Sequence, residues 1–82
     1  MARLLYFGRL EDALGLATET LTLPSDIADT SALRTWLDSS RQLGGALLEL
    51  TVRIALNDQI VSEPCPVTDA DEIAFLPPVG GG

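Results

Sequence analysis

Alternating apolar and polar residues predict a hairpin at the start of the chain. Residues 2–7 form a short apolar run of strand-forming residues. Residues 18–23 alternate between polar and apolar positions, with Leu21 and Leu23 on one face, and Pro24 ends the segment. Two such runs close together in the sequence favour a two-stranded hairpin.

The same alternation predicts three more strands in the second half of the chain. Residues 51–57 alternate cleanly, which is typical of a strand buried on one face. Asn57-Asp58 is a turn signal, so residues 59–61 are expected to be a short partner strand. Residues 72–76, EIAFL, are predicted to form the last strand.

Between these two groups of strands the period changes to that of a helix. Leu33, Trp36 and Leu37 recur at i, i+3 and i+4, and this stripe predicts a helix of about three turns. Asp29 or Thr30 is a suitable N-cap. We expect all three stripe residues, Trp36 included, to lie in the core.

Shorter segments complete the expected order of elements. Residues 8–17 indicate a brief helical turn or loop, residues 46–50 a second short helical turn, and residues 63–71 a loop marked by Pro and Asp. The resulting order, β-β-α-β-β-β, predicts an α+β roll in which one main helix packs on a mixed sheet of four to five strands. We expect one domain over residues 1–76 and a flexible tail over residues 77–82.

Composition then narrows the classes of function. The chain has 82 residues and a net charge of −7, which makes nucleic acid an unexpected partner and a basic protein a more plausible one. It has no histidine and one cysteine, Cys65, so His/Cys metal clusters and Ser/His/Asp or Cys/His nucleophile systems are excluded. We expect no metal and no bound cofactor. No segment has the length of a membrane span, and the expected compartment is the cytoplasm.

One face of the predicted sheet carries apolar residues where polar ones are usual. If Ile73 and Phe75 face the helix, Leu76 faces outward, and the same alternation places Phe7 and Ile60 on the outer side as well. Large apolar residues gathered on an exposed face usually mark a binding surface. The alternative is a register shifted by one residue, which would place these side chains in the core.

The sequence ends in a segment that suits neither a helix nor a strand. Pro77 and Pro78 have no N–H to donate, so they cannot continue a central strand and are expected to direct the chain away from the sheet. Beyond them follow Val79, Gly80, Gly81 and Gly82. Four extended residues span about 13 Å, and glycines without a Cβ can enter a narrow channel. The alternative is an ordinary frayed terminus.

These features together resemble a known family. The ending F-L-P-P-V-G-G-G (75–82) and the preceding T-D-A-D-E-I-A (68–74) are similar to the small, sulfur-carrying subunit of molybdopterin synthase, the MoaD family of ubiquitin-like β-grasp proteins. The opening L-L-Y-F-G-R-L (4–10) and the helix S-A-L-R-T-W-L (31–37) fit as well, so the resemblance covers essentially the whole chain. One departure is Ala70, which stands where the family usually has glycine in a D-G-D turn.

The resemblance implies a carrier cycle with three protein partners. An E1-like adenylating enzyme uses ATP to convert the Gly82 carboxylate into an acyl-adenylate, and a sulfur donor protein turns that into a thiocarboxylate. The loaded tail then enters the large molybdopterin synthase subunit, which carries the catalytic side chains, and gives sulfur to cyclic pyranopterin monophosphate. The family also implies a heterotetramer of two large and two small subunits. Gly81 and Gly82 match its functional pair, and Phe7, Ile60 and Leu76 fall where it carries hydrophobic docking residues.

Two other functions fit the sequence pattern. Sulfur carriers for thiazole or cysteine synthesis share the fold and the terminal glycines. A β-grasp interaction module could use the apolar face for a partner while its tail stays inert. The three readings differ in whether the last glycine acquires sulfur and in which protein the outer face binds.

Overall fold

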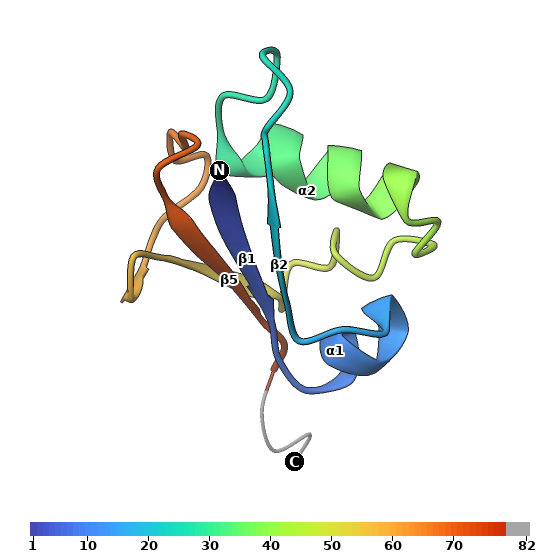
Figure 1. The fold of residues 1–82 in the computed structure, drawn as a ribbon. Coiled ribbons are helices and arrows are strands. Elements are labelled where there is room, and N and C mark those ends of the chain that lie inside the picture. The colour runs from blue at the N-terminus through green and yellow to red at the C-terminus, as the bar shows by residue number, and fades with distance from the viewer. Residues whose placement is uncertain (79–82) are drawn as a thin grey trace.

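Five strands form one mixed sheet, and a single long helix packs across one of its faces (Figure 1). The computed structural model describes residues 1–78. In chain order the elements are β1 (Ala2–Tyr6), α1 (Arg9–Leu14), β2 (Thr18–Leu21), α2 (Thr30–Ser40), β3 (Arg53–Leu56), β4 (Gln59–Ile60) and β5 (Glu72–Leu76). The predicted fold class is therefore confirmed, and the brief turn expected after the first strand is the short helix α1.

The strand order β2-β1-β5-β3-β4 places the last strand in the middle of the sheet. β1 and β5 run parallel, and every other neighbouring pair is antiparallel. Both predicted hairpins are present, β1 with β2 and β3 with β4. The second closes through Asn57 and Asp58, whose φ angles of 50° and 71° are those of the primed turn that suits a two-residue hairpin.

The core lies between α2 and the inner face of the sheet. Leu33 and Leu37 of α2 are fully buried, as the apolar stripe predicts. Trp36 departs from the prediction, because it is only partly buried and packs at the margin of the core. Asp29 is the N-cap, and its Oδ1 accepts the N–H of Ala32 at 2.8 Å. The sheet contributes the fully buried Ala2, Leu4, Ile54, Ile73 and Phe75.

The turn around Ala70 forms without positive φ at that residue. The positive-φ residues of the described chain other than glycine are Gln42, Asn57 and Asp58. The Asp71 N–H bonds the Thr68 carbonyl at 3.2 Å, while Asp71 Oδ2 accepts the Thr68 N–H at 2.7 Å. Hydrogen bonds from Asn57 and then from Thr68 lower the pKa of the Asp71 carboxyl. The carboxylate therefore organises a turn that accommodates Ala70 without positive φ at that residue.

Residues 46–50 were expected to form a short helical turn; the structure has hydrogen-bonded turns there and no helix. The segment is a series of turns, because buried side chains of α2 bind its backbone groups. Asp38 accepts the N–H groups of Gly45 and Leu47, each at 2.9 Å. The segment's own backbone bonds are separate turns, from the Leu48 N–H to the Gly45 carbonyl and from the Val52 N–H to the Glu49 carbonyl, each at 3.0 Å.

Arg34 supplies the other half of this organisation. It is 7% exposed, and its guanidinium donates to the carbonyls of Leu47, Glu49 and Val52. It also binds the Glu63 carboxylate with two nitrogens, at 2.9 and 2.6 Å. One side chain thus joins α2, the segment before β3 and the loop after β4. Bidentate pairing of this kind is the strong form of the arginine–carboxylate contact.

A second network ties the first hairpin to the end of α2. The hydroxyl of Tyr6, which is 1% exposed, donates to Glu19 Oε2 at 2.7 Å. Arg41 binds the other oxygen of Glu19 at 2.5 Å. Burial, followed by the hydrogen bond to Glu19, raises the pKa of Tyr6 well above its ordinary value.

Neither helix in residues 1–78 has the length and apolar character that a membrane crossing requires.

Replacing Arg34 by methionine should lower the free energy of unfolding by about 3 kcal/mol, because it leaves Glu63 and three carbonyls without their partner. Urea denaturation measures this loss. The matched control is Arg9→Met, which removes the exposed Arg9–Glu49 pair and should cost less than about 1 kcal/mol. Equal losses in the two variants would contradict the central role of Arg34.

The free energy of unfolding should fall as pH rises above about 10, the pKa of tyrosine in an unfolded chain. The folded protein holds the Tyr6 proton more tightly, so this stabilisation is complete below that pH and is lost as the pH rises toward the folded pKa. The chain has one tyrosine and no lysine, which leaves few other groups that titrate there. In the Tyr6→Phe variant the free energy of unfolding should fall less steeply with pH. If it falls equally in both proteins, the pH dependence does not come from Tyr6.

Candidate functional site

An apolar row crosses four strands on the face of the sheet opposite α2. Leu5 pairs with Ala74, Ala74 with Ala55, and Ala55 with Ile60. Paired residues of neighbouring strands point to the same side of a sheet, so the four side chains lie side by side. Three of the four belong to β5, β3 and β4, so the row extends to the sheet edge at β4.

The three predicted interface residues extend this surface. Phe7 is 46% exposed, Ile60 is 57% exposed and Leu76 is partly exposed. Phe7 follows Tyr6, which pairs with Phe75, so Phe7 lies beside the end of β5 that Leu76 forms. The outer apolar face is defined by Leu5, Phe7, Ala55, Ile60, Ala74 and Leu76. The register therefore brings the predicted residues onto one surface, and their role in docking remains a prediction.

A groove of about 550 Å³ lies where the last strand ends. Its lining residues come from the segment before β3, from β3 and β4, and from the end of β5: Leu50, Thr51, Arg53, Ile60, Leu76, Pro77 and Pro78. The groove is thus continuous with the outer apolar face through Ile60 and Leu76. It borders the point at which the chain leaves the sheet.

The exit of the chain is held against the turn that follows β1. Gly8 has φ 57° and ψ −133°, a conformation that side-chain-bearing residues rarely adopt. A Cβ at this position would lie 3.0 Å from Cγ of Pro77. The close approach needs glycine for both reasons. The contact places Pro77 beside the residue that precedes α1. Figure 1 shows α1 near the lower end of β5.

The rest of the predicted tail falls outside the described residues. Pro77 and Pro78 follow β5 as expected, and they line the groove. Val79, Gly80, Gly81 and Gly82 lie beyond residue 78, and their predicted roles are taken up below. The lone Cys65 is partly buried, and its N–H donates to Oγ1 of Thr30 at 3.1 Å. Cys65 thus helps to seat the loop after β4 on the start of α2.

Sequence patterns did not identify two exposed leucines in the segment before β3, of which Leu50 lines the groove and Leu48 does not. Leu50 is 96% exposed and Leu48 is 47% exposed. Both lie in the segment that Arg34 and Asp38 hold, where Leu47 takes the buried position. The sequence did contain an indication: Leu47, Leu48 and Leu50 fall within four residues, outside any alternating strand. A loop cannot bury three leucines so close together, so some of them were bound to be exposed.

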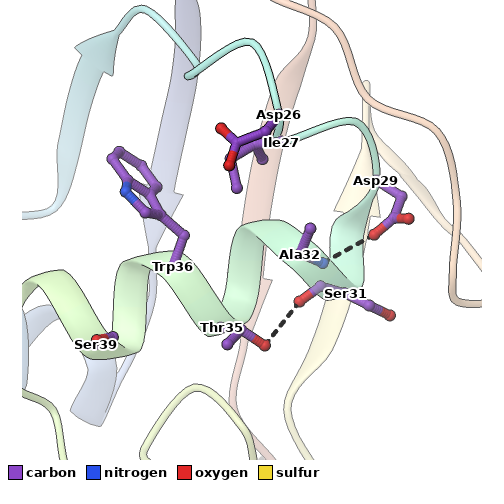
Figure 2. Close-up of a pocket in the computed structure, with 8 residues that line it drawn as sticks. All are labelled: Asp26, Ile27, Asp29, Ser31, Ala32, Thr35, Trp36 and Ser39. Carbon is purple, nitrogen blue, oxygen red and sulfur yellow. Dashed lines mark hydrogen bonds between the residues drawn. The ribbon is translucent and has the colours of Figure 1, made fainter.

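A second hollow lies along the exposed side of α2 and includes its N-cap, Asp29. Figure 2 shows Trp36 on the same side of the helix as Asp26 and Ile27. Two of its polar side chains serve the helix itself, since Asp29 caps Ala32 and the Thr35 hydroxyl donates to the Ser31 carbonyl at 3.1 Å. None of the residues expected to form the docking face or the tail lines this hollow. The outer apolar face and its groove are therefore the candidate site.

Comparison with known proteins places this geometry in a family. The model of the ThiS family matches residues 4–82. The molybdopterin synthase sulfur carrier subunit of Escherichia coli (strain K12) is 34% identical over 83 aligned positions, and the alignment covers 100% of both chains.

Solved structures agree with this assignment. The complex of subunits 1 and 2 of the molybdopterin-converting factor from Helicobacter pylori 26695 contains a chain with a TM-score of 0.66 and 28% identity. That match covers 99% of this chain and 97% of the other. SAMP1 from Haloferax volcanii has a TM-score of 0.79 at 18% identity, over 99% and 98% of the two chains, and supports the fold alone. The chain belongs to the ThiS family of ubiquitin-like β-grasp proteins and is a relative of the molybdopterin synthase sulfur carrier subunits.

Proposed function

We propose that this protein is a sulfur carrier in molybdenum cofactor biosynthesis, the small subunit of a molybdopterin synthase. The observation that carries the proposal is the full-length match at 34% identity to a protein of that name. The match includes the last residues of the chain, which such a carrier would need. The fold supports it, because the central strand β5 leads directly from the core into the tail.

The outer apolar face supports a large synthase subunit as the docking partner. The Helicobacter pylori structure is a complex of two subunits, one of which resembles this chain. Phe7, Ile60 and Leu76 would pack against the partner, and Pro77 would direct the tail into it. Exposed apolar area of this kind is stabilised when a partner covers it. We expect the family's assembly of two large and two small subunits.

The proposed chemistry occurs at the carboxylate of Gly82. An E1-like adenylating enzyme lets this carboxylate displace pyrophosphate from ATP, which gives an acyl-adenylate with AMP as a good leaving group. A sulfur donor protein then supplies sulfur at the oxidation level of sulfide, whose attack on the acyl carbon displaces AMP, and the product is a thiocarboxylate. The tail delivers that sulfur to cyclic pyranopterin monophosphate in the large subunit, whose side chains perform the catalysis.

The chain's composition supports this division of labour. Without histidine it has few means of acid–base catalysis near neutral pH, and ATP is used by the partner and not held here. One cysteine allows no internal disulfide, in keeping with a cytoplasmic cycle. The same tail chemistry would serve a carrier for thiazole or cysteine synthesis, so the large-subunit partner is the distinguishing feature.

Intact-mass spectrometry tests the carrier chemistry. Protein incubated with its adenylating enzyme, ATP and a sulfur donor should acquire one sulfur in place of one oxygen. Deletion of Gly82 should abolish that species, because the remaining terminus no longer reaches the reacting centre at the right length. Gly80→Ala is the matched control and should still be loaded. Absence of the sulfur-bearing species from the unaltered protein would rule out the carrier function.

Binding to the large synthase subunit of the same organism tests the docking face. Phe7→Asp and Leu76→Asp should each weaken binding at least about tenfold, because a carboxylate would be buried in an apolar contact. Leu48→Asp makes the same chemical change at an exposed leucine off this face and should bind normally. Calorimetry or surface plasmon resonance gives the affinities. Equal affinities across the set would remove this face from the interface.

A further inference from the structure

Arg53 differs from every other arginine of the chain in its pairing. Four of the five arginines lie within 4.0 Å of a carboxylate: Arg3 with Glu72 at 3.6 Å, Arg9 with Glu49 at 2.8 Å, Arg34 with Glu63 at 2.6 Å and Arg41 with Glu19 at 2.5 Å. All twelve acidic residues of the sequence lie within residues 1–78. Within that described part of the chain, Arg53 is the one arginine with no carboxylate partner.

Arg53 lies inside the candidate docking surface. It is exposed on β3 directly opposite Leu76 of β5, on the outer face of the sheet. It lines the groove together with Leu50, Ile60 and the two prolines of the exit. Its outer-face neighbour two residues along β3 is Ala55, which is apolar. Arg53 therefore stands exposed among mostly apolar residues, where solvent water hydrates its guanidinium.

Docking at this face would remove that water. A guanidinium that loses its hydration without gaining an acceptor is costly to bury, and arginine makes its best contact with a carboxylate, which its planar fork binds with two parallel hydrogen bonds. The groove around it supplies apolar contacts on several sides. A partner that fits must therefore place an acidic side chain over Arg53, among apolar side chains that meet Ile60 and Leu76.

We infer that Arg53 is a specificity-determining residue of the docking face. Its guanidinium pairs with an acidic side chain that an apolar segment of the large synthase subunit supplies. This inference rests on the proposed function, because it takes the large subunit as the occupant. The charge of the chain favours a basic partner surface, so an acidic residue opposite Arg53 is a local exception within it. Such an exception distinguishes the correct partner from other basic proteins.

Affinity for the large synthase subunit of the same organism tests the inference. Arg53→Met should weaken binding about tenfold, and Arg53→Glu about a hundredfold, because the second places two carboxylates together. Arg53→Lys should retain part of the affinity, since it keeps the charge and loses the fork. The matched control is Arg3→Met, which removes an equal charge from the same face at an existing ion pair and should change binding less than about threefold.

The outcomes separate this inference from the proposed function. If Arg53→Met and Arg53→Glu bind like the unaltered protein while Leu76→Asp does not, the docking face stands and the role of Arg53 is wrong. If the unaltered protein fails to bind the large subunit, the proposed function fails and the inference with it. Recovery of Arg53→Glu binding by an Asp→Arg or Glu→Arg substitution in the large subunit would identify the acidic partner. Urea denaturation of each variant confirms that an exposed substitution has left the fold intact.

Discussion

The buried guanidinium of Arg34 is the contact on which the second half of the sheet depends. It reaches from the middle of α2 to three carbonyls before β3 and to Glu63 after β4, so it fixes the chain on both sides of the second hairpin. A buried charge of this kind adds little stability over a well-packed apolar residue. It does require its hydrogen-bond acceptors to lie in one particular arrangement. Here that arrangement sets β3 against β5 and holds Leu50 in solvent. The groove is a consequence of how α2 organises the segment that follows it.

The two faces of β5 separate folding from binding. Ile73 and Phe75 are fully buried beneath α2, whereas Ala74 and Leu76 lie on the outer side. Because the side chains alternate with a period of two, the register that buries the first pair also presents the second. β5 occupies the centre of the sheet, so its position is set by neighbours on both sides. The chain that leaves it at Pro77 therefore starts from one of the most constrained points of the molecule.

Patterns along the sequence predicted the strands and the long helix because each is half-buried, and a half-buried element shows its period in the sequence. The same periods placed Phe7 and Leu76 on the outer side, so most of the candidate face could be predicted. The conformation of residues 44–52 could not, because it depends on Arg34 and Asp38, whose contacts there no local pattern reveals. Which arginine lacks a carboxylate partner within residues 1–78 was likewise hidden, since a pair such as Arg34 with Glu63 spans 29 positions.

The arrangement of charge gives long-range and short-range recognition to different residues. The net charge of −7 acts over the Debye length, about 8 Å at physiological ionic strength, and favours encounter with a basic surface without selecting a register. Four arginines are neutralised by carboxylates of the chain itself, so they add little to the field that a partner meets at close range. Arg53 remains as a positive charge among apolar residues at the exit of the tail. If Arg53 has the role inferred above, a partner drawn in by the acidic surface binds stably only where it also pairs with that charge, and this requirement orients the exit of the tail toward it.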